Sequence, residues 1–218
     1  MNLIFLGPNG AGKGTQARLL QQRQGMPQIS TGDMLRAAIA KGSDLGKEAE
    51  RYVSAGDLVP DAVMIGIIAE RLQQPDVQSG FVLDGFPRTI AQAEALEAVL
   101  AGLNRKLDRL IYFEVSEGTL VRRLSGRMVC RAAGHIYNEN SSRPKAPGVC
   151  DMDGSEVYYR EDDRPDKIRR RLQVYHDKTE PLLAFYRERG LLSVLNAEAD
   201  VEDIYRSLMT MIAPQVRR

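Results

Sequence analysis

A run of glycines between an apolar segment and an amphipathic segment holds the residues most suited to chemistry. It reads Gly7-Pro8-Asn9-Gly10-Ala11-Gly12-Lys13-Gly14-Thr15. The spacing matches the phosphate-binding pattern G-x-x-x-x-G-K, in which bare backbone N–H groups and the positive end of a following helix surround phosphate oxygens. Lys13 would add a mobile positive charge for the outer phosphates. The pattern predicts nucleotide binding and leaves the reaction open.

One position departs from the generic form of this pattern. Gly14 stands where a serine or threonine usually follows the lysine, and Thr15 comes one residue later. In the generic form that hydroxyl contacts the metal ion of the nucleotide. We therefore expect the metal to be held differently in this chain.

Charged side chains follow the expected strand ends. The stretch FVLDGFPR, residues 81–88, ends a buried strand with Asp84 and then turns to present Arg88. Asp84 is placed to hold Mg²⁺, directly or through water, beside the phosphate loop. Further arginines stand at segment boundaries, namely Arg36, Arg123, Arg127, Arg160 and Arg171.

The placement of these arginines favours phosphoryl transfer. Taken singly, an arginine is more often a solvated surface charge. Bidentate guanidinium groups nevertheless suit several phosphates in a dry cleft better than lysines do. Transfer between two nucleotides needs mainly positioning and stabilisation of charge. A histidine general base is an unattractive mechanism, because the chain has two histidines.

The elements that must position these residues alternate along the chain. The expected strands are Leu3–Leu6, Pro27–Ser30, Phe81–Asp84, Leu110–Val115 and Leu191–Leu195. The expected helices are Lys13–Gln24, Ala62–Gln73, Ile90–Leu100, Glu117–Arg127 and a long charged helix over Arg164–Arg189. Such alternation predicts an α/β fold, with a parallel sheet covered by helices on both faces.

Two segments interrupt the alternation. Residues 30–59 carry two helical patterns without a strand between them, and we expect Asp44 to be an N-cap and Gly56 a helix stop. Residues 127–163 are rich in turn-forming residues and predict a small strand-and-turn unit. We expect a core of residues 1–29, 60–126 and 164–218, with residues 30–59 and 127–163 as inserts.

Composition limits the partners that the chain can have. The 218 residues are 43% hydrophobic and 27% charged, and the net charge is +1, so no global field attracts nucleic acid or an anionic membrane. Apolar stretches fall short of the ~18 residues of a membrane span. No signal-peptide pattern precedes the first strand. The two cysteines do not form a disulfide framework. We expect a cytoplasmic protein without nucleic-acid or membrane partners.

With its motifs in this order, the sequence resembles the adenylate kinase family in its form with a long lid. The matching stretches are GPNGAGKGTQ, ISTGDMLR, GDLVPD, GFVLDGFPRT, AQAEAL, RLSGRM and YYREDDRPDKIRRRL. The resemblance implies a five-stranded parallel sheet of the phosphate-loop type, a helical AMP-binding insert at residues 30–59 and a β-rich lid at residues 127–163. It also implies the magnesium-dependent reaction ATP + AMP = 2 ADP, which balances adenine nucleotides, in a monomer.

The resemblance also implies which residues contact the substrates. For ATP these are Gly10, Ala11, Gly12, Lys13, Gly14, Thr15, Arg123, Arg127, Ile136, Tyr137 and Ala199. For AMP they are Thr31, Arg36, Asp57, Leu58, Val59, Gly85, Phe86, Pro87, Arg88, Gln92, Arg160 and Arg171. The catalytic residues would be Lys13, Arg88, Arg123, Arg160 and Arg171, with Asp84 holding Mg²⁺ through water.

The choice of acceptor rests on Thr31 and Gln92. A glutamine amide offers a donor and an acceptor to the edge of adenine, and Thr31 is the residue that the family uses for AMP. The simpler alternative is that Gln92 is an exposed helix residue. Three other functions stay open: a UMP or CMP acceptor, a GTP donor, or a non-catalytic nucleotide-binding regulator. Lys13, Asp84 and Arg88 argue against the regulator.

The lid contains a candidate structural zinc site. Related long lids carry C-x2-C…C-x2-C or C-x2-C…C-x2-D ligands, whereas here Ala133 occupies the second position. Cys130, His135, Cys150 and Asp153 are chemically suitable as a tetrahedral set. A metal-free hairpin base held by hydrogen bonds is the alternative. A Cys130–Cys150 disulfide is a third, which a reducing compartment disfavours.

Overall fold

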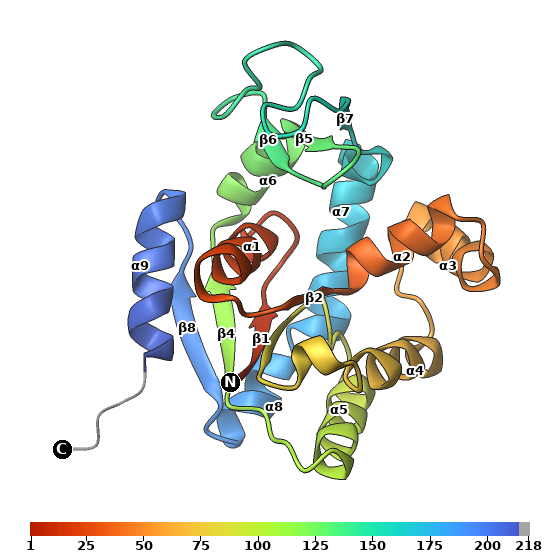
Figure 1. Cartoon of the computed structure of the whole chain (residues 1–218), viewed down its shortest axis with the longest axis vertical. Coiled ribbons are helices and arrows are strands. Elements are labelled where there is room, and N and C mark those ends of the chain that lie inside the picture. Colours follow the sequence, from red (N-terminus) through yellow and green to blue (C-terminus); the bar gives the residue numbers. More distant parts are fainter. Residues whose placement is uncertain (214–218) are drawn as a thin grey trace.

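A computed structural model describes residues 1–213 of the chain (Figure 1). The large sheet contains β1 (Asn2–Leu6), β2 (Gln28–Ser30), β3 (Phe81–Asp84), β4 (Arg109–Glu114) and β8 (Leu192–Asn196). The helices are α1 (Lys13–Gln24), α2 (Thr31–Ala40), α3 (Asp44–Ala55), α4 (Asp61–Arg71), α5 (Ile90–Gly102), α6 (Glu117–Ser125), α7 (Pro165–Val174), α8 (Leu182–Glu188) and α9 (Val201–Ile212). Residues 214–218 of the predicted core segment lie outside the described residues.

The predicted parallel sheet is confirmed. Within residues 1–213 its strand order is β2-β3-β1-β4-β8, and every neighbouring pair is parallel. Each predicted strand matches an observed one to within a residue at either end. Because parallel strands share one carboxyl edge, the loops after β1 and β3 meet there, and ligands of such sheets bind at that edge.

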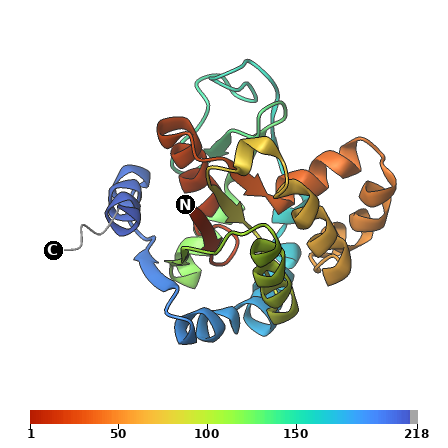
Figure 2. The ribbon, with the colours of Figure 1, turned by 60° about the horizontal axis from the view of Figure 1, so that its bottom comes forward.

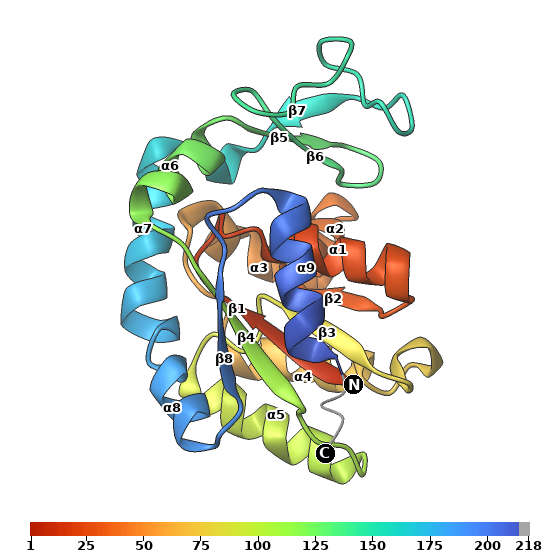
Figure 3. The same cartoon turned by 90° about the vertical axis from the view of Figure 1, so that its left-hand side faces the viewer.

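Alternate strand residues face two apolar layers. On β1, Ile4 and Leu6 pack with α4, α5 and α8, while Leu3 and Phe5 pack with α1, α6, α7 and α9. Figure 3 shows the sheet between these helices, with α9 in front. Burial on both faces explains why the strands are continuous apolar runs in the sequence.

The first insert is the helix pair α2–α3, which projects from the core on the side away from α9 (Figure 2). Gly56, with φ of 79°, ends α3 as predicted. The predicted N-cap was wrong by one residue. The side chain of Ser43 accepts a hydrogen bond from the Gly46 N–H, and Asp44 is the first helical residue, where its charge suits the positive helix end.

The second insert is the lid, which lies above the core in Figure 3. Strands β5 (Arg127–Cys130), β6 (Ile136–Asn138) and β7 (Val157–Tyr159) form an antiparallel sheet in the order β6-β5-β7. Its buried cluster consists of Cys130, Tyr137, Cys150 and Val157. The lid therefore has a very small apolar core.

The single helix predicted over Arg164–Arg189 was wrong. The chain forms α7, then a π-helical segment at Tyr175–Thr179, then α8. In the π segment the Glu180 N–H donates to the Tyr175 carbonyl. Pro181 explains the break, because its ring lacks an N–H and crowds the preceding turn of a regular helix. The wider turn buries Tyr175 and Thr179.

None of the helices in residues 1–213 combines the length and apolar character that a membrane crossing needs.

Candidate active site

The phosphate loop joins β1 to α1. Gly12 is the N-cap of α1 and has φ of 96°, a conformation that side chains other than glycine disfavour. The Ala11 N–H donates to the Pro8 carbonyl within the loop. The loop therefore lies at the positive end of a helix, as phosphate binding requires.

Lys13 lies folded back over this loop. Its Nζ donates to the carbonyls of Gly7 at 2.6 Å and Pro8 at 2.8 Å. Burial lowers the pKa of Lys13 to about 8, against the opposing effect of Asp84. A buried ammonium next to bare N–H groups would gain strongly from an anion, because phosphate would replace the hydration that burial removes.

Asp84 ends β3 beside the phosphate loop. Its carboxylate accepts from the Gln28 Nε2 at 3.1 Å. A Cβ on Gly14 would stand 3.2 Å from the Asp84 Oδ2. A side chain at this position would therefore crowd the Asp84 carboxylate. Asp84 suits Mg²⁺, which binds proteins through one or two carboxylates and keeps several waters.

After β3, Gly85, Pro87 and Arg88 line one side of a cleft. The Thr31 hydroxyl donates to the Gly85 carbonyl at 3.0 Å. The Arg88 Nε donates to the same carbonyl at 2.8 Å, and burial lowers the pKa of Arg88, which stays charged because an arginine does not lose its proton in proteins. Gln92 is 2% exposed, so the alternative of an exposed helix residue was wrong. Its Oε1 accepts from the Arg88 N–H at 2.7 Å.

Arg36, on α2, lines the same cleft. Its guanidinium donates to the Asp33 carboxylate at 2.5 Å on the same helix, α2. Burial alone would raise the pKa of Asp33, but Arg36 brings it below the ordinary value. The ion pair with Asp33 orients the Arg36 side chain in the cleft lining.

Three arginines meet two aspartates where the lid joins α7. Arg127 binds Asp163 at 2.5 Å, Arg160 binds Asp162, and Arg171 contacts both carboxylates at 3.1 Å and 3.3 Å. Burial by itself would raise the pKa of Asp162, but the guanidinium partners have the larger effect together and bring this pKa below its ordinary value. Burial lowers the pKa of Arg171 to about 10. The aspartates thus prearrange a dense positive cluster.

The remaining predicted ATP residues lie around the lid base and the start of α9. The Arg123 Nη2 donates to the Ala197 carbonyl at 2.9 Å and lies 3.5 Å from the Ala199 carbonyl. Ile136 is 40% exposed, and Tyr137 is buried in the lid cluster. Arg123 and Ala199, which are 76 positions apart in the sequence, are therefore neighbours.

One cleft brings most of the predicted phosphate-binding groups together. Its lining includes Lys13, Arg36, Asp57, Arg88, Gln92 and Arg171. Arg127 and Arg160 lie next to it through the Asp162–Asp163 cluster, and Arg123 lies further along, on α6.

Sequence reasoning missed three kinds of residue at this site. Asp162 and Asp163 organise the arginines, Thr179 donates to the Arg88 carbonyl at 3.0 Å, and Asp61 accepts from Gln92. Asp61 follows the predicted AMP segment 57–59 by two positions, a proximity that was available as a signal. No such signal was available for Thr179, because it lay inside the predicted long helix.

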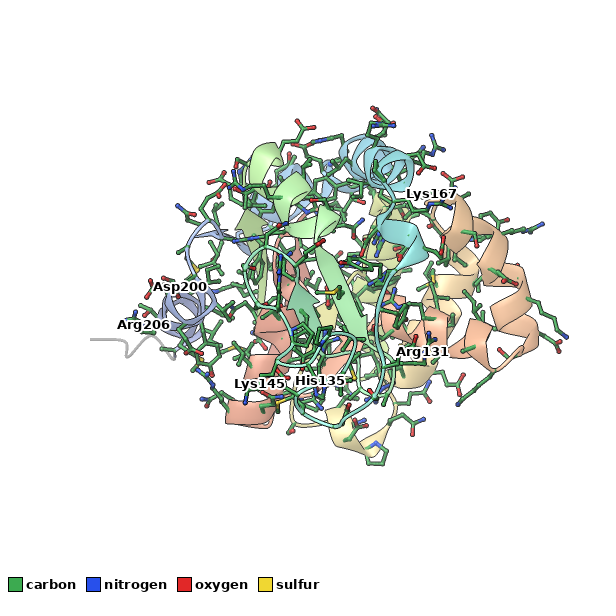
Figure 4. All side chains as sticks on the ribbon, turned by 90° about the horizontal axis from the view of Figure 1, so that it is seen from above. Arg131, His135, Lys145, Lys167, Asp200 and Arg206 are labelled. Carbon is green, nitrogen blue, oxygen red and sulfur yellow. The ribbon has the colours of Figure 1, made fainter. Side chains whose placement is uncertain are left out.

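The four lid residues proposed as metal ligands converge. One ligand atom from each of Cys130, His135, Cys150 and Asp153 lies within 4.8 Å of every other. The Sγ of Cys150 lies 3.2 Å from the His135 Nδ1, and the Sγ of Cys130 lies 3.2 Å from the Asp153 Oδ2. Neither cysteine forms a disulfide in the described chain. Figure 4 looks down on the lid and labels His135.

The donor set fits zinc. Burial opposes ionisation of Cys130, but hydrogen bonds from Ser155 and the Ala133 N–H lower its pKa to about 7. A thiolate is the form that binds metal. Tetrahedral zinc ligands stand about 3.5 Å apart, so a modest contraction of the cluster would complete the site.

The fold and the cleft define a phosphate-loop nucleotide-binding protein. A family model described as adenylate kinase matches residues 5–191. The chain is 50% identical to an adenylate kinase of Archaeoglobus fulgidus over 97% of its length and 98% of the relative. It is 49% identical to one of Geobacter sulfurreducens over the same shares, and 47% identical to one of Thermodesulfovibrio yellowstonii over 97% and 99%. The chain belongs to the adenylate kinase family, a family of phosphotransferases.

Proposed function

We propose that the chain catalyses the reversible, magnesium-dependent reaction ATP + AMP = 2 ADP and so balances adenine nucleotides. The observation that carries the proposal is that Lys13 of the phosphate loop lines the same cleft as Arg88 and Arg171. Membership of the adenylate kinase family supports the same reaction.

On the donor side, the backbone of residues 10–15 and Lys13 bind the ATP phosphates. Arg123 and Arg127 hold them from the lid base, and the adenine lies between Ile136–Tyr137 and the Ala199 carbonyl. Asp84 holds Mg²⁺ through water. When bound, the ion neutralises phosphate charge and makes the β-phosphate a better leaving group.

On the acceptor side, Arg36 and Arg88 bind the AMP phosphate, and Thr31 and the Asp57-Leu58-Val59 backbone surround its adenosine together with Gly85, Phe86 and Pro87. Gln92 binds the base. An AMP phosphate would take Arg36 from Asp33, because the doubly charged phosphate is the stronger partner for a guanidinium.

The transfer itself needs positioning and charge. Arg160 and Arg171 contact both phosphate groups as negative charge spreads over the transferred group. The lid, residues 127–163, and the insert, residues 30–59, exclude water, which would otherwise accept the phosphoryl group in place of AMP. The core of residues 1–29, 60–126 and 164–218 keeps Lys13 and Arg88 in place meanwhile.

The lid cluster has a structural role in this proposal. Cys130, His135, Cys150 and Asp153 bind one Zn²⁺ that fastens the loops of the lid together. All four positions would be filled by protein, which leaves no open site for catalysis. We further propose a cytoplasmic monomer that uses ATP, AMP and ADP and binds neither nucleic acid nor membrane.

A nucleotide panel tests this function. ADP formation is measured with ATP or GTP as donor and AMP, UMP or CMP as acceptor. We expect ATP with AMP to give the highest kcat/KM. Preference for UMP, CMP or GTP would establish a different nucleoside monophosphate kinase. Nucleotide binding without turnover on any pair would establish the non-catalytic regulator.

A further inference from the structure

Asp61 is the first residue of α4 and lies beside Gln92, which lines the cleft. Its Oδ1 accepts from the Gln92 Nε2 at 2.7 Å, and its Oδ2 accepts from the Thr89 hydroxyl at 2.8 Å. The Thr89 hydroxyl in turn accepts from the Gln92 backbone N–H at 3.1 Å. One carboxylate thus ties the start of α4 to the start of α5.

These contacts fix the orientation of the Gln92 amide at both ends. The Nε2 faces a carboxylate, and the Oε1 faces the Arg88 N–H at 2.7 Å. Turning the amide over would place an oxygen against the Asp61 carboxylate and an NH₂ group against the Arg88 N–H. Both contacts would be repulsive, and Gln92 is buried, so water could not relieve them.

The amide retains one donor and one acceptor. A glutamine side chain has two N–H donors and two acceptor lone pairs, and Asp61 and Arg88 use one of each. The remaining pair matches a base that presents an acceptor beside an amino group, as adenine does with N1 and its 6-amino group. Hypoxanthine presents an N–H and a carbonyl at these positions, which is the opposite order.

We propose that Asp61 is a positioning residue that sets the base specificity of the acceptor site by fixing the orientation of the Gln92 amide. This inference rests on the proposed function. Asp61 is not part of the cleft lining, so it would act through Gln92.

The test compares AMP with inosine monophosphate as acceptors, using ATP as donor. In Asp61→Asn the side chain at position 61 can present either an oxygen or an NH₂ group to Gln92. The orientation of the Gln92 amide is then fixed only by the Arg88 N–H. We expect the preference for AMP, as a ratio of kcat/KM values, to fall about tenfold, the size expected when one orienting hydrogen bond weakens. KM for AMP should rise, while kcat and KM for ATP stay near the native values.

A double-mutant cycle separates positioning from general stability. In a Gln92→Ala background, adding Asp61→Asn should leave the preference between the two acceptors unchanged, because there is no amide left to orient. Asp76→Asn is the matched control, since Asp76 pairs with Arg71 at the other end of α4. An unchanged preference in folded Asp61→Asn, or an equal loss in both backgrounds, would overturn the proposal.

A measurement on the native protein covers the case in which the variant fails to fold. In the nuclear magnetic resonance spectrum of the native chain, one proton of the Gln92 side-chain amide should exchange with solvent much more slowly than the other. Equally fast exchange of both protons would refute the fixed orientation. Absence of AMP phosphorylation by the native protein would instead refute the proposed function, so the two failures are distinct.

Discussion

The core and the two inserts hold their functional residues in different ways. In the core, the phosphate loop joins β1 to Lys13 at the start of α1, and Asp84 is the last residue of β3. The residues of both strands are almost wholly buried between two helical layers. The lid has four buried cluster residues, and two of them are cysteines. The helix insert depends on a close approach between α2 and α3.

This difference shows what each region needs from its sequence. A large apolar core positions charged groups accurately, because every strand is fixed by neighbours on both faces. A unit as small as the lid buries too little apolar surface to do so, and such units commonly rely on a metal or other cross-link. We therefore expect substitution of the charged cleft residues to affect chemistry, and substitution of the residues that hold each insert together to affect stability.

The largest effect should come from Arg88 in the core. Arg88→Ala removes a buried guanidinium that lines the cleft. We expect kcat to fall roughly a thousandfold, the upper range for loss of one transition-state donor, while the melting temperature stays close to the native value. Arg187→Ala, on the exposed surface of α8, is the control. A rate within tenfold of the native one would contradict the role of Arg88.

The next effect concerns Lys13 and pH. The pKa of Lys13 in the free protein is lowered to about 8 by burial, so Lys13 loses its charge as the pH rises through that value. We expect kcat/KM for ATP to fall about tenfold for each pH unit above about 8, because this parameter reports the free enzyme. The value of kcat should hold to higher pH, since bound phosphates keep the proton on Lys13. A flat kcat/KM up to pH 10 would refute this assignment.

Removal of zinc should affect the lid alone. Metal analysis of the purified protein should find one zinc per chain, and a chelator should lower the free energy of unfolding. Compared with protein in free zinc at a hundred times the Kd, the metal-free protein should have a free energy of unfolding that is lower by about 3 kcal/mol. Cys150→Ser should abolish the chelator effect, whereas Met152→Ala, at a position that is 72% exposed, should preserve it. Protein that contains no zinc and melts unchanged in chelator would establish the metal-free lid.

The smallest effects distinguish the helix insert from the core. A Cβ at Gly46 would stand 2.1 Å from the Ala38 carbonyl oxygen, so Gly46→Ala must push α2 and α3 apart. We expect it to destabilise the protein by about 1–3 kcal/mol. Gly66→Ala, in α4, meets no atom within 4 Å and should stabilise by about 0.5–1 kcal/mol. Thermal unfolding checks both, and equal effects of the two substitutions would contradict the comparison.

The sequence predicted most of the core because its signals are local. The strand Phe81–Asp84 and the helix Lys13–Gln24 were predicted with their observed bounds, because a buried strand and a glycine turn can each be recognised from a few neighbouring residues. The choice of Ser43 over Asp44 as N-cap was not predictable, because both residue types cap helices well. The π segment arises from Pro181, whose effect on a long helix depends on what the widened turn can bury.

Many residues of the candidate site were predictable from the sequence, but the contacts between them were not. The phosphate loop and Arg88 are visible in the sequence, whereas the role of Asp163 is not, because Asp163 binds Arg127 across 36 positions. Asp61 and Gln92 are 31 positions apart and meet only because α4 and α5 start side by side. Such pairings depend on the three-dimensional fold, and local patterns in one sequence do not reveal them.

The most direct test of the account is the binding of one molecule that spans both nucleotide sites. In isothermal titration, a bisubstrate mimic with two adenosines joined by a polyphosphate chain should bind once per protein chain. We predict a Kd at least about a hundredfold lower than that of ATP, because the second adenosine binds at high effective concentration, and an excess of AMP should weaken the binding. Affinity no higher than that of ATP, unaffected by AMP, would contradict the claim that one cleft holds both nucleotides end to end.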